Sequence, residues 1–292
     1  MNNPPGQTDQ SIAALLADVD GTLVTKEKVL TARAIEAVKR LQEHGAFFCI
    51  TSGRPPRGLR MFVEPLDLTV AMAAFNGGVL VRPDLSVIDE KPLPTDIPQG
   101  VIRTLREHKL DVWIYGPMDW YVTDPKGTRV DRETSTIQFP PVVVPTYERV
   151  LDKVIKIVGV SNNLEAVARC EASLQGQFGT RVSAARSQPY YLDVTHPDAN
   201  KGAVVDRLAR YLKVPPQHIA TIGDQPNDVL MFKRSGLSIA MGNASPEVQR
   251  QATFVTTSFG DEGFANAVER FVLPRAQSKK ENYEYESHTT AS

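Results

Sequence analysis

Apolar residues fall into two kinds of segment that alternate along the first part of the chain. Short apolar runs, which predict buried strands, occupy residues 12–17, 46–50 and 70–75. Between them, apolar residues recur every three or four positions, which predicts helices over about 31–44 and 59–63. Thr31 is a candidate N-cap of the first helix, and Gly45 is its stop signal. Strands that alternate with helices predict a parallel sheet with right-handed crossovers.

The pattern changes at about residue 83. Up to about residue 189, strands follow one another through short turns and are accompanied by two helices, which predicts an α+β module. From Lys201 the alternation of helix and strand resumes. The elements expected in the module are helices near 101–108 and 164–177 and strands near 112–115, 120–123, 155–160, 181–184 and 190–194. Those expected after it are a helix from 201, strands at 219–222, 237–241 and 253–256, and helices near 246–251 and 263–271.

The predicted fold class is therefore α/β, with a Rossmann-like, doubly wound parallel sheet as the core and an inserted α+β domain. The core domain is discontinuous and comprises residues 11–82 and 190–274, and the inserted domain comprises residues 83–189. Residues 1–10 are polar with Pro and Gly, and we expect a flexible tail there. Residues 275–292 are almost free of aliphatic side chains, and we expect a disordered tail there.

A pair of carboxylates follows the first predicted strand. Asp18 and Asp20 alternate along an extended segment, so their side chains start on the same face. Two close carboxylates repel each other unless a cation lies between them or one of them takes up a proton. A magnesium ion with oxygen ligands suits the first arrangement, and a nucleophile beside a general acid suits the second.

Three more polar clusters lie at strand ends or helix starts, where side chains of an open parallel sheet line one crevice. They are Thr51-Ser52-Gly53-Arg54, Asn200-Lys201-Gly202 and Gly223-Asp224-Gln225-Pro226-Asn227-Asp228. In their order and spacing, these clusters and the first carboxylate pair resemble the haloacid dehalogenase (HAD) superfamily of phosphohydrolases, specifically its Cof-like sugar-phosphatase branch. The resemblance extends from about residue 12 to residue 271. It implies that the inserted domain is a type II (subclass B) cap, which excludes water and supplies substrate contacts.

The reaction chemistry assigned to the carboxylates agrees with this resemblance. Asp18 is the candidate nucleophile, because a carboxylate can attack phosphorus to give an aspartyl-phosphate. Asp20 is the candidate general acid, and then the base that activates water. The resemblance implies that Mg²⁺ is bound by the carboxylates of Asp18 and Asp224 and by the backbone carbonyl of Asp20. Asp228 follows Asp224 by four residues, one helical turn, and is the candidate for orienting the metal or its waters.

The remaining candidates bind the substrate. Thr51 and Ser52 offer hydroxyl and N–H groups to a phosphate, and the Lys201 ammonium can stabilise the charge of the transferring phosphoryl group. In the resembled family, Asn227 contacts the phosphoryl group or solvent. Two further residues, Arg54 and Asn76, are candidate substrate contacts.

Composition narrows the expected partners. The chain has 292 residues, with 34 acidic and 33 basic side chains and a formal net charge of −1, so its charge favours neither nucleic acid nor an anionic membrane as a partner. Its two cysteines, Cys49 and Cys170, do not form a C-x-x-C pair, which argues against a zinc site or a disulfide framework. No secretory signal or membrane span is evident, and we expect a cytoplasmic protein.

The leading interpretation is a magnesium-dependent phosphatase acting on a small phosphorylated metabolite, a sugar phosphate in the first instance. One alternative is a phosphosugar mutase, which would move the phosphoryl group between positions of a sugar rather than release inorganic phosphate. Another is a non-enzymic phosphometabolite-binding protein. The presence of Asp18, Asp20, Lys201 and Asp224 argues against that last alternative.

Overall fold

The apolar run around Leu15 forms an inner strand of a parallel sheet in the computed structural model, which describes residues 11–276. All five residues of this strand are buried, so both of its faces are covered, as expected for a parallel sheet between helices. The strands of this sheet that belong to the core unit pair in parallel. In spatial order they are β14 (Phe254–Val255), β13 (Leu237–Ala240), β12 (Ile219–Gly223), β1 (Ala14–Asp18) and β2 (Phe47–Thr51).

The described chain divides into two compact units. The core unit comprises residues 11–51, 64–71 and 201–276, and the inserted unit comprises residues 52–63 and 72–200. The inserted domain expected at 83–189 lies within the inserted unit, which also takes in the segment around Ser52. The tail expected at 1–10 lies outside the described residues. The tail expected at 275–292 also lies outside them, apart from Arg275 and Ala276. The carbonyl of Arg275 accepts a hydrogen bond from the backbone amide of Ile12 (2.6 Å).

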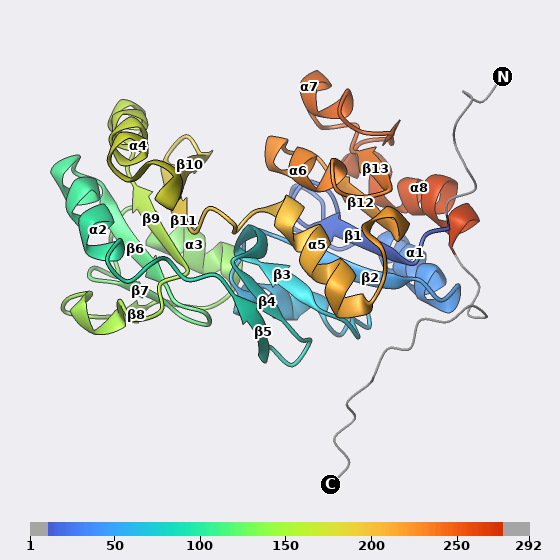
Figure 1. The fold of residues 1–292 in the computed structure, drawn as a ribbon, viewed down its shortest axis with the longest axis horizontal. Helices are drawn as coiled ribbons and strands as arrows, with labels where there is room; N and C mark the ends of the chain where they lie inside the picture. Colours follow the sequence, from blue (N-terminus) through green and yellow to red (C-terminus); the bar gives the residue numbers. More distant parts are fainter. Residues whose placement is uncertain (1–10, 277–292) are drawn as a thin grey trace, which may run out of the picture. The chain divides into compact units, whose positions relative to one another are not determined.

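Helices flank the parallel sheet of the core unit (Figure 1). The hydroxyl of Thr31 accepts a hydrogen bond from the amide of Ala34, so Thr31 is the N-cap that the sequence predicts. The first helix packs near α8 (Gly263–Ala267), and the ring of Phe264 on α8 meets that of Phe48 on β2 edge-on, with 5.8 Å between centroids. The helices are α1 (Ala32–Glu43), α5 (Lys201–Leu212), α6 (Val229–Phe232), α7 (Pro246–Gln249) and α8 (Gly263–Ala267). The predicted α/β class is confirmed.

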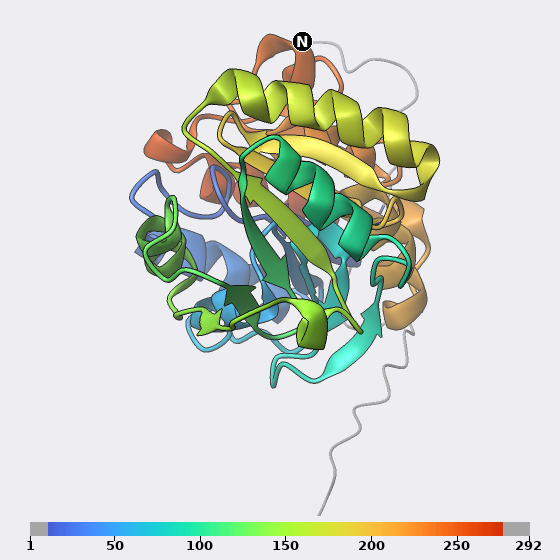
Figure 2. The same cartoon turned by 90° about the vertical axis from the view of Figure 1, so that its left-hand side faces the viewer.

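The inserted unit is built mainly on an antiparallel sheet. Two helices, α2 (Pro98–Glu107) and α4 (Leu164–Phe178), lie on the same side of this sheet (Figure 2). In spatial order its strands are β10 (Ser183–Gln188), β11 (Tyr191–Thr195), β9 (Lys156–Val160), β6 (Asp111–Tyr115), β7 (Trp120–Val122) and β8 (Val142–Val143). Three short strands, which pair as antiparallel neighbours, precede them: β3 (Met72–Ala74), β4 (Val79–Val81) and β5 (Val87–Glu90).

Alternation along the strands builds the core of the inserted unit. Ile114 on β6, Ile157 on β9 and Leu192 on β11 pack together with residues of α2 and α4 in one aliphatic cluster. Their neighbours in the sequence point to the opposite face of the sheet. This sheet is therefore aliphatic on the side that α2 and α4 cover.

The sequence analysis missed five elements: the strands β4, β5 and β8, and the helices α3 (Val130–Ile137) and α6. Only the first and last residues of α3 are buried, so the helix has no apolar period to detect. Its N-cap, Arg129, has a left-handed backbone and gives no side-chain cap. The strands that were missed have only two to four residues each. Among residues 11–276, no helix is long and apolar enough to cross a membrane.

We expect Ile157→Ala to destabilise the inserted unit by about 2–5 kcal/mol, because it removes a fully buried side chain and leaves a cavity. The matched control is Val143→Ala on β8, where the side chain is exposed and the change should be within about 0.5 kcal/mol. Urea unfolding followed by circular dichroism measures both. Equal effects of the two substitutions would contradict the assignment of Ile157 to the core.

Candidate active site

The parallel register brings three strand ends together. Asp18 is paired with Thr51 across β1 and β2, and Ala17 is paired with Ile222 across β1 and β12. Because the strands are parallel, their carboxyl ends lie at the same edge of the sheet. Asp224 follows β12 directly at that edge.

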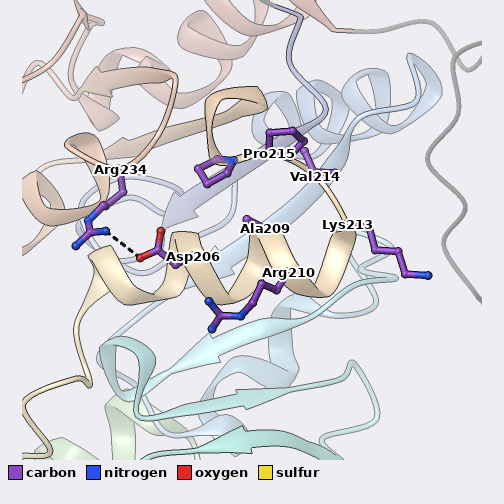
Figure 3. A pocket seen from close by; sticks show the side chains of 8 residues that line it. Asp206, Ala209, Arg210, Lys213, Val214, Pro215 and Arg234 are labelled. Carbon is purple, nitrogen blue, oxygen red and sulfur yellow. Dashed lines mark hydrogen bonds and ion pairs between the residues drawn. The ribbon is translucent and has the colours of Figure 1, made fainter.

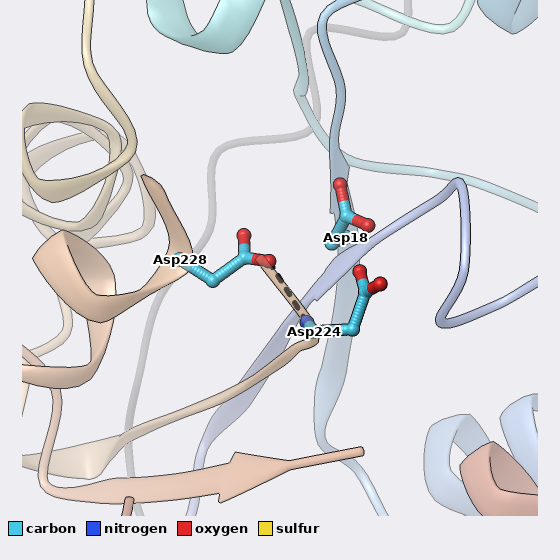
Figure 4. A group of neighbouring side chains, drawn as sticks. All are labelled: Asp18, Asp224 and Asp228. Atoms are coloured by element: carbon cyan, nitrogen blue, oxygen red, sulfur yellow. Dashed lines mark hydrogen bonds between the residues drawn. The ribbon is translucent and has the colours of Figure 1, made fainter. Parts of the chain in front are cut away.

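Three carboxylates meet there (Figure 4). Asp18, Asp224 and Asp228 each offer an oxygen, and the three oxygens lie within 4.8 Å of one another. The side chains come from the end of β1 and from the loop that follows β12. None of these residues is more than 5% exposed, so their charges are poorly screened by water.

Lys201, the first residue of α5, neutralises part of this charge. Its Nζ donates to Oδ1 of Asp18 and to Oδ1 of Asp228, both at 2.6 Å, and the residue is 2% exposed. Burial alone would lower the pKa of Lys201, but the two carboxylates outweigh it and raise the pKa above its usual value. Lys201 is therefore held as an ammonium ion.

Asp228 fixes the shape of the loop after β12. Its Oδ2 accepts hydrogen bonds from the amides of Asp224 (2.9 Å) and Gln225 (2.8 Å), while Oδ1 accepts from Lys201. Both oxygens are thus engaged, and Asp228 is completely buried. These contacts suit the orienting role expected for Asp228 more than direct metal ligation.

Two glycines allow the carboxylates to approach the backbone. A Cβ at Gly223 would lie 2.3 Å from Cγ of Asp228, and a Cβ at Gly21 would lie 2.6 Å from Oδ2 of Asp224. Gly21 also has a φ of +91°, which a side chain would strain. The glycines of the Asp18–Thr22 and Gly223–Asp228 clusters are therefore needed for close packing as well as for turning the chain.

The electrostatics of this cluster favour a divalent cation. Burial raises the pKa of Asp18 to about 8 against the opposing effect of Lys201, and Asp228 and Asp224 raise it further. Burial also raises the pKa of Asp224. When ionised, three carboxylates and one ammonium leave two negative charges, which a divalent cation would balance. The donors are all oxygens, as Mg²⁺ prefers, and Oδ2 of Asp18 accepts no hydrogen bond from the residues that the structure describes.

Asp224 has further neighbours that the sequence analysis did not select. Its carboxylate accepts hydrogen bonds from the side-chain amides of Gln225 (2.6 Å) and Asn243 (3.3 Å) and from the hydroxyl of Thr22 (3.4 Å). Asn243 also donates to the carbonyl of Gly21 (2.9 Å) and so ties two loops together. The signal for Asn243 was available, because it follows β13 as the other polar clusters follow their strands.

Asp20 is not one of the three carboxylates of this cluster. Its Oδ1 forms an ion pair with Nζ of Lys28 at 2.7 Å, and its side chain is 31% exposed. The strand ends at Asp18, so the extended alternation that would place both side chains on one face stops there. An acid at this position is more accessible to water than Asp18 is.

The predicted phosphate-binding residues differ in their surroundings. Thr51 is fully buried, and its Oγ1 has no hydrogen-bond partner among residues 11–276. Asn227 is exposed, between Pro226 and Asp228. The buried hydroxyl of Thr51 is the kind of group that is expected to have a partner when a ligand is present.

Ser52, Arg54 and Asn76 belong to the inserted unit. The amide of Asn76 donates to the carbonyl of Ser52 (2.7 Å), and the hydroxyl of Ser52 accepts from the amide of Arg54 (3.2 Å). Arg54 is buried, and its guanidinium lies over the ring of Phe62. The structure therefore places these three predicted contacts in one connected loop region.

A model of the haloacid dehalogenase-like hydrolase family matches residues 15–268. The chain belongs to this family. A protein of Haemophilus influenzae named as a phosphatase is 28% identical over 258 residues, which cover 88% of this chain and 97% of that protein. One 5-amino-6-(5-phospho-D-ribitylamino)uracil phosphatase of Bacillus subtilis is 24% identical over 281 residues, which cover 87% of this chain and 96% of that protein. A haloacid dehalogenase-like hydrolase of Bacteroides thetaiotaomicron has the same fold, with a TM-score of 0.81 at 24% identity over 89% of this chain and 99% of that one.

These findings confirm the resemblance predicted from the sequence, and they identify the HAD hydrolase described here as a phosphatase. A separate surface pocket of about 500 Å³ on its core unit is not part of the site (Figure 3). That pocket contains none of the predicted site residues, and its Arg234 is paired with Asp206 (3.2 Å). Its lining residues are Asp206, Ala209, Arg210, Lys213, Val214, Pro215, Pro216 and Arg234.

We expect Asp224→Asn to make the metal-free hydrolase more stable by about 1 kcal/mol, because it removes one of three crowded, buried negative charges. The Thr22 hydroxyl can rotate to accept a hydrogen bond from the new amide. The same substitution should remove most of the stabilisation that Mg²⁺ gives the wild type. Thermal unfolding in EDTA and in Mg²⁺ measures both effects.

Asp152→Asn, which changes an exposed carboxylate, is the matched control and should leave both values close to those of the wild type. A variant at Asp224 that is less stable than the wild type in EDTA would contradict the charge-crowding argument.

Proposed function

We propose that this phosphatase hydrolyses the phosphomonoester of a small, polar metabolite, such as a sugar phosphate, with Mg²⁺ as cofactor and an aspartyl-phosphate intermediate on Asp18. The observation that carries the proposal is the contact of Asp18 with Lys201 inside the buried carboxylate cluster. A carboxylate in this setting is positioned by one oxygen and has the other available for reaction. The name of the Bacillus subtilis relative, whose substrate is a phosphorylated ribityl compound, supports a hydroxyl-rich metabolite.

In the proposed first step, Oδ2 of Asp18 attacks phosphorus and the bond to the leaving alkoxide breaks. The Lys201 ammonium, held 2.6 Å from Oδ1 of Asp18, stabilises the negative charge of the phosphoryl oxygens. The buried hydroxyl of Thr51 and the loop at Ser52 are the proposed phosphate contacts, with Asn227 as a further one. Positioning and charge stabilisation supply most of the acceleration in reactions of this kind.

Asp20 is the proposed general acid of the first step and general base of the second. It would give its proton to the leaving oxygen and then take one from the water that attacks the aspartyl-phosphate. Its partial exposure fits a group that must exchange protons with solvent. Free phosphate and the regenerated Asp18 carboxylate complete the cycle.

Asp18 and Asp224 are the proposed metal ligands through their carboxylates, with the backbone carbonyl of Asp20 as a third and Asp228 as an orienting residue. When bound, Mg²⁺ would neutralise the repulsion between the substrate phosphate and the Asp18 carboxylate. The named activity of the relatives favours hydrolysis over a mutase reaction, and release of inorganic phosphate distinguishes the two.

We expect Asp18→Asn to lower phosphate release by at least about a thousandfold, because the amide cannot act as the nucleophile. The measurement is release of inorganic phosphate from a panel of phosphorylated metabolites. Circular dichroism should show that the variant is folded, and the matched control Asp152→Asn should retain wild-type turnover. Turnover by folded Asp18→Asn protein would exclude Asp18 as the nucleophile.

We expect EDTA to abolish turnover and added Mg²⁺ to restore it, because the cluster carries excess negative charge beside the nucleophile. Ca²⁺ should restore much less, since its larger radius and flexible coordination suit an in-line displacement poorly. The comparison is made by titrating each ion into the dialysed protein. Full turnover in EDTA would remove the metal from the proposal.

A further inference from the structure

The loop that follows β13 reaches the same edge of the parallel sheet as the carboxylate cluster. β13 pairs in parallel with β12, with Ala240 opposite Gly223, so the two strands end side by side. Asn243 is the third residue after β13, and Asp224 follows β12 directly. Asn243 and the whole carboxylate cluster belong to the core unit, so every contact between them lies within one unit.

The side-chain amide of Asn243 has a partner for each of its polar groups. Nδ2 donates to the carbonyl of Gly21 (2.9 Å) and to Oδ2 of Asp224 (3.3 Å), and Oδ1 accepts from the backbone amide of Phe259 (3.1 Å). A flipped amide would set its oxygen against two acceptors and its nitrogen against a donor. Three partners on three different loops therefore fix one orientation of this amide.

The loop that carries Asn243 is held in place without this side chain. The backbone amide of Gly242 donates to the carbonyl of Thr257 (3.0 Å). The side-chain amide of Gln249 donates to the carbonyls of Gly242 (3.2 Å) and Ala244 (3.0 Å). Asn243 itself is exposed and fills no part of the core. Its hydrogen bonds therefore serve the neighbouring loops more than its own.

The two oxygens of Asp224 are engaged unequally. Oδ2 accepts from the side-chain amides of Gln225 (2.6 Å) and Asn243, which occupy both of its lone-pair positions. Among the described residues, Oδ1 accepts from the hydroxyl of Thr22 alone, at 3.4 Å. Oδ1 of Asp224 therefore keeps room for a cation, as Oδ2 of Asp18 does.

The bond to Gly21 acts on the other loop of the proposed metal site. Gly21 follows Asp20, whose backbone carbonyl is the third proposed ligand, and its φ of +91° turns the chain sharply at this point. The side-chain amide of Asn243 holds the carbonyl of Gly21 in one direction. One amide thus holds the carboxylate of one proposed ligand and the turn that carries another.

We propose that Asn243 is a positioning residue of the metal centre, which presents Oδ1 of Asp224 and the turn at Asp20 to one divalent cation. This inference rests on the proposed function, in which Mg²⁺ is the cofactor. A neutral amide suits the task because it orients a carboxylate without cancelling the charge that attracts the cation, as an ammonium or guanidinium would.

The test measures Mg²⁺ binding separately from turnover. Isothermal titration calorimetry of the dialysed, full-length protein gives the dissociation constant of Mg²⁺. Asn243→Ala should raise this constant about tenfold, the size of effect that is typical when a group orienting a metal ligand is removed. Circular dichroism should show that the variant is folded, because the side chain is exposed and its loop is held by other bonds.

Turnover gives a second readout. Excess Mg²⁺ should restore most of the release of phosphate from 4-nitrophenyl phosphate by Asn243→Ala protein, because occupancy of the metal site is what the substitution lowers. A loss of turnover that is the same at every Mg²⁺ concentration would contradict this role.

Asn266→Ala is the matched control. The side-chain amide of Asn266 donates to the hydroxyl of Thr257 (2.8 Å) and to the carbonyl of Asp261 (2.9 Å), in the loop that contains Phe259. Removing this amide loosens the same loop but breaks no contact with Asp224. The control should bind Mg²⁺ with the affinity of the wild type.

Asn243→Asp separates hydrogen-bond donation from shape. The new side chain has the same size and can still accept from the amide of Phe259, but it loses both donors and turns a carboxylate oxygen toward Asp224. In EDTA this variant should unfold a few degrees below Asn243→Ala, because a fourth negative charge joins the cluster.

An unchanged dissociation constant in folded Asn243→Ala protein, or an equal change in Asn266→Ala, would overturn the inference and leave the phosphatase function intact. Asn243→Asp protein as stable in EDTA as the wild type would also overturn it. A wild type that binds no Mg²⁺ would instead refute the metal of the proposed function, and this inference with it.

Discussion

The ammonium of Lys201 between two buried carboxylates is the interaction on which the site depends. Without it, Asp18, Asp224 and Asp228 would place three negative charges within a few ångströms in a region that water barely reaches. With it, the cluster keeps a net charge that suits one divalent cation. Lys201 therefore contributes to folding as well as to the proposed chemistry, and the two roles cannot be separated by a single substitution.

The backbone around this interaction is adapted to it. The parallel register sets the ends of β1, β2 and β12 side by side, so residues that are distant in the sequence meet without a long loop. Asp228 then binds the amides of Asp224 and Gln225 and holds the loop in one shape. Rigid strands and a tied loop provide the fixed geometry that electrostatic catalysis requires.

Much of this arrangement could be predicted from the sequence. The strand ends at Asp18 and Asp224, the helix start at Lys201 and the N-cap at Thr31 carry local signals in apolar runs and turn residues. The expectation that Asp18 and Asp20 share a face rested on a continued strand, but the strand stops at Asp18. The ion pair of Asp20 with Lys28 depends on how the following turn folds, which no periodic pattern encodes.

The inserted unit was harder to predict for related reasons. α3 has no apolar period, yet it brings Glu133 to the hydroxyl of Tyr115. The strand β9 has the sequence pattern of a plain apolar run. Nothing in that pattern indicates that Lys156 meets Asp193, which lies 37 positions later in the sequence and is brought close by the pairing of β9 with β11. Contacts of this kind follow from the pairing of strands, so they become visible only with the tertiary structure.

The chain passes from one unit to the other just after Thr51 and just before Lys201. The ion pairs of Lys201 with Asp18 and Asp228 therefore close within the core unit, while the ion pair of Lys156 with Asp193 lies wholly within the inserted unit. Substitutions in separate networks combine almost independently. Substitutions among residues 72–200 can for this reason accumulate without disturbing the ion pairs that hold Asp18 in place.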